Sequence, residues 1–474
     1  ITGIALLLVY SLLNIYAISL DIWWLSLVPI GLGVVAFALL KPAQFWLFLV
    51  LLTPFSLNVH IDAISSSVTL PTEPFIAFFM LLLIMKFLLA NKIDYAVLKH
   101  PITIIIIAQL IWMLLSACFS TLPLISFKYL LSRVWFVVVF YFFGIHVFKE
   151  IKRIDQFNWL YVMSMGLAII YTLVRHSTEF FSHEYSYKAA LPFFSDHNIY
   201  AVIIAFFIPT TLIYALKGRT LKIGIFKGIG FDIFTAVYLI GVVASYTRAA
   251  WVSLGVALMM YAAVLLKLKL RHLLFALSIL VGGLAFSWND IMLYMGKNKV
   301  ESDSDFDAHV QSIYNVTTDD SNTERLNRWS AAVRMFIEKP VFGFGPNTYQ
   351  FKYAPFQLAK EKTEISTNLG DLGNAHSEFI GPLAEQGFIG ALLVVLLMLF
   401  AVRTSMNLFY NPANERVKYL ALMVMLSFMT YYSHGLLNNY LDIDKANISF
   451  WASMAILTAL SVYHSPNSAK LRKL

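Results

Sequence analysis

The chain has 474 residues, of which 59% are hydrophobic and 13% are charged, with a formal net charge of +8. A soluble protein of this size needs more polar residues to cover its surface, so the composition excludes a soluble enzyme, a disordered chain and a fibrous protein. A polytopic membrane protein remains, because about 20 apolar residues suffice for one transmembrane helix.

Apolar runs along the chain predict as many as fourteen transmembrane helices. Several runs are short and Pro54 interrupts one of them, so we expect twelve to fourteen spans in an all-α bundle. In chain order the runs lie near residues 2–20, 22–40, 43–57, 75–91, 102–119, 126–148, 157–175, 198–216, 230–246, 250–267, 272–288, 379–402, 417–436 and 447–463.

Basic residues gather on alternate loops, whereas the short loops at Asp21, 58–74 and 120–125 carry almost none. Cytoplasmic loops of membrane proteins collect Lys and Arg. The alternation therefore predicts that both termini are cytoplasmic, and it explains most of the net charge without nucleic acid as a partner. The basic set comprises Lys41, Lys92, Lys99, Lys149, Lys152, Arg153, Lys217, Arg219, Lys222, Lys227, Lys269, Arg271, Arg403, Arg416, Lys418, Lys470, Arg472 and Lys473.

The longest polar segment, residues 289–378, falls on the opposite, extracytoplasmic face. Within it, a capping residue and Pro340 delimit a predicted helix from Thr323 to Ile337. We therefore divide the chain into three parts. These are a transmembrane bundle of about eleven spans at 1–288, a large, partly helical periplasmic loop at 289–378 that packs as a lid, and transmembrane helices with a short cytoplasmic tail at 379–474.

Unexpected polar residues mark function in a membrane protein, and His376 is one of them, just before a long apolar helix. A neutral histidine takes a proton from a hydroxyl group near pH 7, and the positive end of a helix dipole favours the neutral form. His376 is therefore a candidate general base, with Glu378 as a candidate helper. The alternative is an interfacial histidine and a first-turn carboxylate at a helix start.

Three arginines stand out on the predicted outer face. Arg248 lies in a tight turn between two spans, where it either anchors the chain at the membrane surface or binds an anion. Arg325 and Arg328 are three residues apart and share one face of the predicted helix. Together with Arg248 they would form a cationic pocket for a diphosphate; the alternative is a solvated amphipathic helix.

Other polar residues could contact a donor or an acceptor. Asn198 begins a predicted span, either as a helix cap or as a ligand contact. Lys128 and Arg133 lie in the outer half of the 126–148 run, where a cation is costly, so both are expected to face a cavity. The chain has no phosphate-binding Gly-Lys loop and its outer histidines do not cluster, so we expect neither a nucleotide nor a metal ion as cofactor.

In the order and topological side of its motifs, the chain resembles the O-antigen ligase / O-antigen polymerase superfamily, which also includes bacterial protein O-oligosaccharyltransferases. The resemblance covers nearly the whole architecture, and an O-antigen ligase is the member expected. Ala249 and Ser377 depart from the family's usual Gly and Asn. The matching motifs are Asp196-His197-Asn198, Ser245-x-x-Arg248, Glu324-Arg325-x-x-x-Trp329, Pro340-x-x-Gly343-x-Gly345, Asn374-x-His376 and Glu385-x-Gly387-x-x-Gly390.

This resemblance implies a GT-C-like glycosyltransferase that takes a glycan from undecaprenyl diphosphate at the periplasmic face of the bacterial inner membrane. It makes His376 the base for the acceptor and makes Arg248 and Arg325 the diphosphate ligands, with Arg328 as a further candidate. One base and one displacement predict inversion at the anomeric carbon. The expected partners are the lipid-linked glycan, membrane lipids and a lipid A-core acceptor; Ser or Thr of a protein, or a second lipid-linked glycan, are alternative acceptors.

A polytopic lipid or ion transporter is the alternative of another class. Such a carrier is expected to hold paired charges at the bilayer midplane and to show an internal repeat. The sequence shows neither feature, and its unexpected charges gather at the predicted outer face instead.

Overall fold

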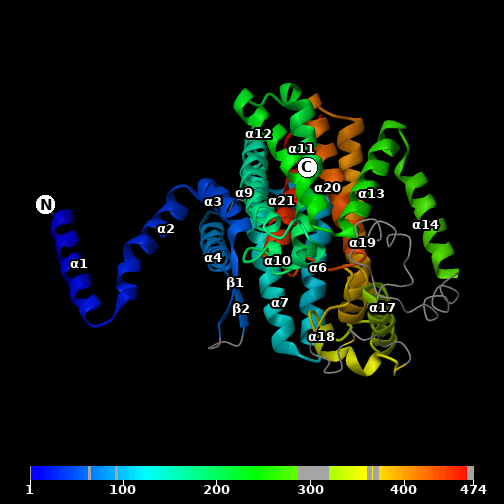
Figure 1. Cartoon of the computed structure of the whole chain (residues 1–474), viewed down its shortest axis with the longest axis horizontal. Coiled ribbons are helices and arrows are strands. Elements are labelled where there is room, and N and C mark those ends of the chain that lie inside the picture. The colour runs from blue at the N-terminus through cyan, green and yellow to red at the C-terminus, as the bar shows by residue number, and fades with distance from the viewer. Residues whose placement is uncertain are drawn as a thin grey trace.

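The computed structural model describes residues 2–61, 66–90, 94–286, 320–359, 366 and 373–466. These residues form an all-α bundle with a single two-stranded antiparallel ribbon, in which β1 (Leu57–Ile61) pairs with β2 (Ser66–Leu70). Figure 1 shows the helices of the bundle side by side, with the ribbon and helices α17 and α18 at its lower end. The expected all-α polytopic fold is confirmed.

Every predicted apolar run overlaps a helix of the structure. Pro54 lies in a 3-10 turn (Thr53–Phe55) that ends α3, which confirms the predicted interruption. The helices are α1 (Thr2–Ser19), α2 (Val28–Leu40), α3 (Pro42–Leu52), α4 (Thr72–Ala90), α5 (Tyr95–Leu98), α6 (Pro101–Cys118), α7 (Pro123–Phe136), α8 (Phe143–Val147), α9 (Ile151–Ser177), α10 (His183–Ala189), α11 (His197–Leu221), α12 (Ile225–Ala244), α13 (Arg248–Leu265), α14 (Leu270–Phe286), α17 (Asp320–Glu338), α18 (Tyr349–Lys352), α19 (Ile380–Tyr410), α20 (Glu415–Gly435) and α21 (Asp444–Tyr463).

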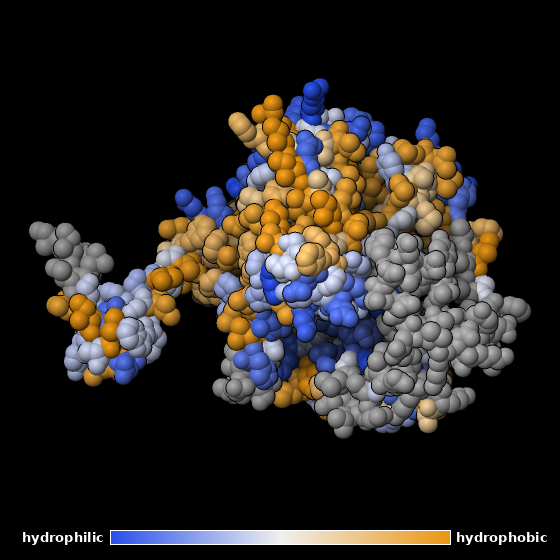
Figure 2. Space-filling view, in the orientation of Figure 1, coloured by the Kyte–Doolittle hydropathy of each residue, from blue (hydrophilic) through white to orange (hydrophobic). Residues whose placement is uncertain are grey.

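Within the described residues, nine helical segments are long and apolar enough to cross a membrane, and Val9–Ser19 and Pro42–Phe55 are shorter apolar helices. The nine include Trp23–Leu40, which joins a 3-10 turn to α2, and Pro123–Val147, which joins α7 to α8 through a π-helical turn. Apolar surface covers the sides of the bundle in Figure 2, as a lipid environment requires, and hydrophilic surface gathers around a hollow beside α10.

Helices α11 and α21 form the centre of the bundle. In their most apolar 18-residue stretches, 78% and 89% of the residues are buried. By contrast, only 6% of the residues of Trp23–Leu40 are buried, and α1 and α2 extend away from the other helices in Figure 1. The centre is therefore built from the middle and the C-terminal part of the chain, which also carry the candidate site residues.

The described part of the long polar loop, residues 320–359 and 373–379, is called the lid below. Its helix α17 ends at Glu338, just before Pro340, as the sequence predicts. Beyond it, the lid docks on α19 through backbone hydrogen bonds. The amide of Gly345 donates to the carbonyl of Glu385 (2.8 Å), and the amide of Phe388 donates to the carbonyl of Pro340 (3.0 Å).

Three glycines allow this docking because each has a positive φ: +67° at Gly343, +113° at Gly345 and +69° at Gly387. A Cβ at Gly343 or Gly387 would collide with backbone atoms of the opposite segment. The Gly-x-Gly turn and the Glu-x-Gly motif, which are distant in the sequence, are thus two halves of one junction. Packing at this junction explains the positions of these glycines, so the glycines need no catalytic role.

Candidate active site

His376 lies at the junction between the lid and α19, in a strained backbone conformation. Its φ of +47° lies in the left-handed region, which is uncommon for residues other than glycine. Two contacts hold it there: its amide donates to Oδ1 of Asn374 (3.0 Å), and its carbonyl accepts from the indole of Trp329 (3.4 Å). Such conformations persist where the surroundings impose them, and they cluster at functional sites.

The imidazole of His376 has a defined tautomer in this structure. Its Nδ1 lies 2.6 Å from Oδ1 of Asn438, an oxygen that can only accept, so Nδ1 carries the proton. Nε2 is then the nitrogen with a lone pair for a substrate hydroxyl. Burial lowers the pKa of His376 to about 4; the bond to Asn438 raises it, and the charges of Arg328 and Arg325 lower it. The ring is therefore a neutral base at neutral pH.

Glu378, the predicted helper of His376, forms hydrogen bonds with other residues of the protein. Its Oε1 accepts hydrogen bonds from the Tyr431 hydroxyl (2.8 Å) and from the amides of Tyr440 (2.5 Å) and Leu441 (2.9 Å). Burial raises the pKa of this carboxyl group, and the nearby charge of Asp442 raises it further. Glu378 thus fixes the loop between α20 and α21, on which Asn438 lies.

The two arginines of α17 have different surroundings. Arg328 is buried: its Nε donates to Oε1 of Glu324 (2.8 Å), its Nη1 donates to the carbonyl of Asn374 (3.1 Å), and its guanidinium lies 5.4 Å from the Tyr353 ring centre. Arg325 is half-buried, and its charge lowers the pKa of His376. Both arginines therefore act electrostatically on His376, Arg328 more than Arg325, and Arg328 in addition has hydrogen-bond partners within the lid.

Arg248 is the first residue of α13 and follows a tight turn. Tyr246 in this turn has a φ of +51°, and the buried Ser245 Oγ accepts from the amide of Thr247 at 3.3 Å. Arg248 itself is half-buried. The turn thus fixes the backbone at the point where α13 presents its first side chain.

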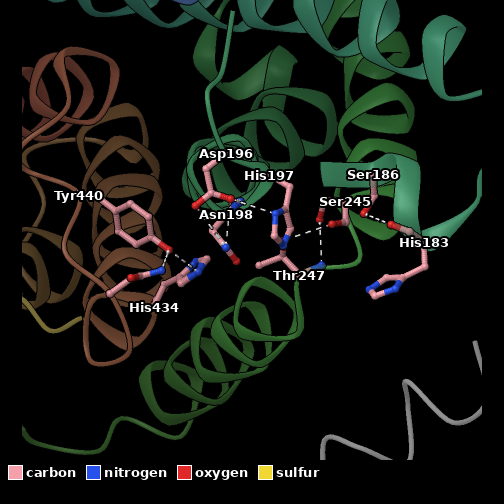
Figure 3. Close-up of polar contacts among 10 residues, drawn as sticks. His183, Ser186, Asp196, His197, Asn198, Ser245, Thr247, His434 and Tyr440 are labelled. Atoms are coloured by element: carbon pink, nitrogen blue, oxygen red, sulfur yellow. Dashed lines mark hydrogen bonds and ion pairs between the residues drawn. The ribbon is translucent and has the colours of Figure 1, made fainter. Parts of the chain in front are cut away.

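The Asp196-His197-Asn198 motif lies next to this turn. Figure 3 shows it between Ser245 and Thr247 on one side and His434 and Tyr440 on the other. Oδ1 of Asp196 lies 2.9 Å from Nδ1 of His197 and accepts from the amide of Asn198 at 3.0 Å. The N-cap of α11 is therefore Asp196, and the expectation that Asn198 caps this helix is wrong, because Asn198 lies inside the first turn and its amide donates to the carboxylate of Asp196.

Arg133 lines a pocket of about 50 Å³ among α6, α7, α19, α20 and α21, which is shared with Glu378, Gln386 and Tyr431. Its guanidinium donates to the Tyr129 hydroxyl (2.5 Å) and to Oδ1 of Asn447 (3.3 Å). The cavity expected for Arg133 is present. Lys128 is exposed and does not line this pocket.

Sequence reasoning missed Asn438, Tyr440 and His434. One feature of the sequence could have indicated them: a short polar stretch, Asn438-Asn439, between the apolar runs 417–436 and 447–463. The Tyr440 hydroxyl accepts from the side-chain amide of Asn438 (3.1 Å) and lies 2.8 Å from Nε2 of His434, the second contact being visible in Figure 3. Among the residues that the structure describes, no group of three or more His, Cys, Asp or Glu side chains could hold a metal ion.

Residues 233–395 match the family model described as O-antigen ligase. The matched segment contains Arg248, Arg325 and His376, and it runs from α12 into α19. No curated protein matches the chain. The match of this segment supports the predicted resemblance to the O-antigen ligase/polymerase superfamily.

Proposed function

We propose that this protein transfers a glycan from an undecaprenyl-diphosphate donor to a lipid A-core acceptor at the periplasmic face of the bacterial inner membrane. The observation that carries the proposal is the neutral His376, whose Nδ1 is bound to Asn438 and whose Nε2 is left to accept a proton beside the cationic Arg325. The basic loops predicted to be cytoplasmic, such as 217–227, lie between helix ends opposite the lid in Figure 1, which supports the assignment of the two faces.

In the proposed step, Nε2 of His376 takes the proton of the acceptor hydroxyl as its oxygen attacks the anomeric carbon of the donor sugar. The bond between this carbon and the diphosphate oxygen breaks, and the lipid diphosphate leaves with the electron pair. Arg248 and Arg325 bind its negative charge, a task that arginine forks suit. Because one displacement occurs on the face opposite the leaving group, the configuration at the anomeric carbon inverts.

The test compares purified wild type with His376→Ala, Arg248→Ala and Arg325→Ala on a lipid-diphosphate glycan and lipid A-core. Removal of a general base typically slows the reaction by about 10²- to 10⁴-fold. Normal transfer by a stably folded His376→Ala protein would overturn the mechanism. A loss of activity in EDTA that a divalent ion restores would overturn the metal-independent part of the proposal.

The acceptor is tested separately, because the donor site is shared by all three candidate reactions. The same protein and donor are incubated with lipid A-core, with a Ser/Thr peptide, or with donor alone. Product on lipid A-core supports ligation. Product only on the peptide identifies a protein O-oligosaccharyltransferase, and lengthened lipid-linked glycan identifies a polymerase.

A further inference from the structure

We propose that Asn438 is the positioning residue of His376, and that Glu378 acts through Asn438 by holding the α20–α21 loop. The inference rests on the proposed function, in which His376 is the base. It assigns a role to a residue outside the matched segment 233–395, on the loop that follows α20.

The first step is the polarity of a chain of hydrogen bonds. Nδ1 of His376 donates to Oδ1 of Asn438, and Nδ2 of Asn438 donates to the Tyr440 hydroxyl. This hydroxyl also lies 2.8 Å from Nε2 of the buried His434, to which it can donate its own proton. The bond from Asn438 to Tyr440 holds the amide with its oxygen towards His376, and this oxygen sets the tautomer in which Nε2 of His376 accepts.

The second step is how the loop is held. Three donors converge on one oxygen of Glu378: the amides of Tyr440 and Leu441, and the Tyr431 hydroxyl. The amide of Glu378 itself donates to the carbonyl of Gly435 at 2.8 Å. Since Glu378 is two residues from His376, the same short segment carries the base and holds the α20–α21 loop, on which Asn438 lies.

The third step is why an amide suits this position. The charged groups acting on His376 are Arg325, Arg328 and Glu324 on α17; beyond Asn438 lie the titratable Tyr440 and His434. A carboxylate at position 438 would favour the imidazolium form and compete with a phosphate for the arginines. An amide fixes the tautomer without adding charge, as in Cys-His-Asn catalytic sites.

The experiment uses full-length protein and measures the pH profile of kcat/KM for Asn438→Leu and Asn438→Asp. Asn439→Leu and Asn439→Asp are matched controls, because Asn439 is the next residue and donates to Asp442. Loss of the correct tautomer in Asn438→Leu should lower kcat by about 10²-fold or more. Asn438→Asp keeps the acceptor oxygen, so it should remain active at pH 8, with the acid limb of its profile moved up by about 1–3 pH units.

A merely structural asparagine would not move the acid limb. The inference is overturned if Asn438→Asp has the wild-type profile, or if Asn438→Leu transfers glycan within about threefold of wild type. Should Asn438→Leu fail to fold, the Asn438→Asp profile decides alone. His376→Ala, measured in parallel, separates the two claims: an active His376→Ala removes the proposed function, whereas an inactive His376→Ala with normal Asn438 variants removes only this inference.

Discussion

Arg325 and Arg328 lie about one helical turn apart on α17, and the structure predicts that only the replacement of Arg328 by methionine destabilises the lid. Arg328 and Glu324 have side chains only 6% and 5% exposed, and their charged groups are 2.8 Å apart. Removal of one partner breaks this buried ion pair. Measured losses for such changes are about 3–5 kcal/mol.

For Arg328→Met this loss should appear as opening of the lid. Hydrogen–deuterium exchange of the α17 amides reports the free energy of local opening. Since about 1.4 kcal/mol is a factor of ten, about 3–5 kcal/mol corresponds to exchange faster by a factor of about 10² to about 4 × 10³. The guanidinium also bonds the carbonyl of Asn374, two residues before His376, so glycan transfer should fall with the loss of lid structure.

Two comparisons make the prediction sharp. Glu324→Met combined with Arg328→Met replaces the ion pair by apolar side chains, which is often neutral, so the double variant should regain most of the lost protection. Arg325→Met should transfer glycan poorly while its α17 amides exchange as in wild type. If Arg328→Met leaves exchange unchanged yet abolishes transfer, Arg328 contacts the donor and our reasoning is refuted.

Three further outcomes follow from other parts of the molecule. Gly387→Ala should lower the free energy of unfolding by at least about 1–3 kcal/mol, seen as earlier thermal unfolding, because its φ of +69° disfavours a side chain and a Cβ would meet the Val341 carbonyl. Arg133→Met should cost about 1–3 kcal/mol in the same assay because it removes the hydrogen bonds to the Tyr129 hydroxyl and to Oδ1 of the buried Asn447, whereas Lys128→Met should change it by less than about 0.5 kcal/mol. Transfer at low donor concentration should stay level from pH 8 to pH 5 and fall as the pH approaches 4, since His376 must be neutral to accept a proton; loss centred near pH 6.5 would contradict the burial of this ring.

Much of the fold could be predicted because apolar length is an unambiguous signal in a membrane protein. Each of the fourteen runs coincides with a helix, and the α17 boundary follows from its cap and Pro340. The ribbon of β1 and β2 was not predicted, since its strands are only five residues long and lie between two apolar runs. Separation of α1 and α2 from the bundle also left no trace in the sequence, because lipid and protein select the same apolar side chains.

The site was predicted less completely, for a physical reason. His376 and Arg325 could be recognised in the sequence because titratable groups are scarce near apolar helices. Asn438 does not, since an uncharged amide in a polar loop looks like any turn residue, and its meaning depends on a neighbour 62 positions away. For Arg328 the sequence suggested more than the structure supports. Its spacing from Arg325 suggests a shared ligand, but its guanidinium forms hydrogen bonds to Glu324 and to the carbonyl of Asn374 within the lid.

The electrostatics of His376 connect these parts of the mechanism. In the free protein its pKa is lowered to about 4, first because the ring is buried and further because of the charges of Arg328 and Arg325, so the ring is a weak base. In the proposed complex the donor diphosphate brings negative charge to Arg325, which offsets the cationic field and raises the pKa of the ring towards its ordinary range. The base would then gain strength only when the donor is in place, because an opposite charge a few ångströms away favours the protonated form. An amide partner such as Asn438 preserves this dependence, whereas a carboxylate there would keep the base strong, and the arginines partly neutralised, before any donor arrives.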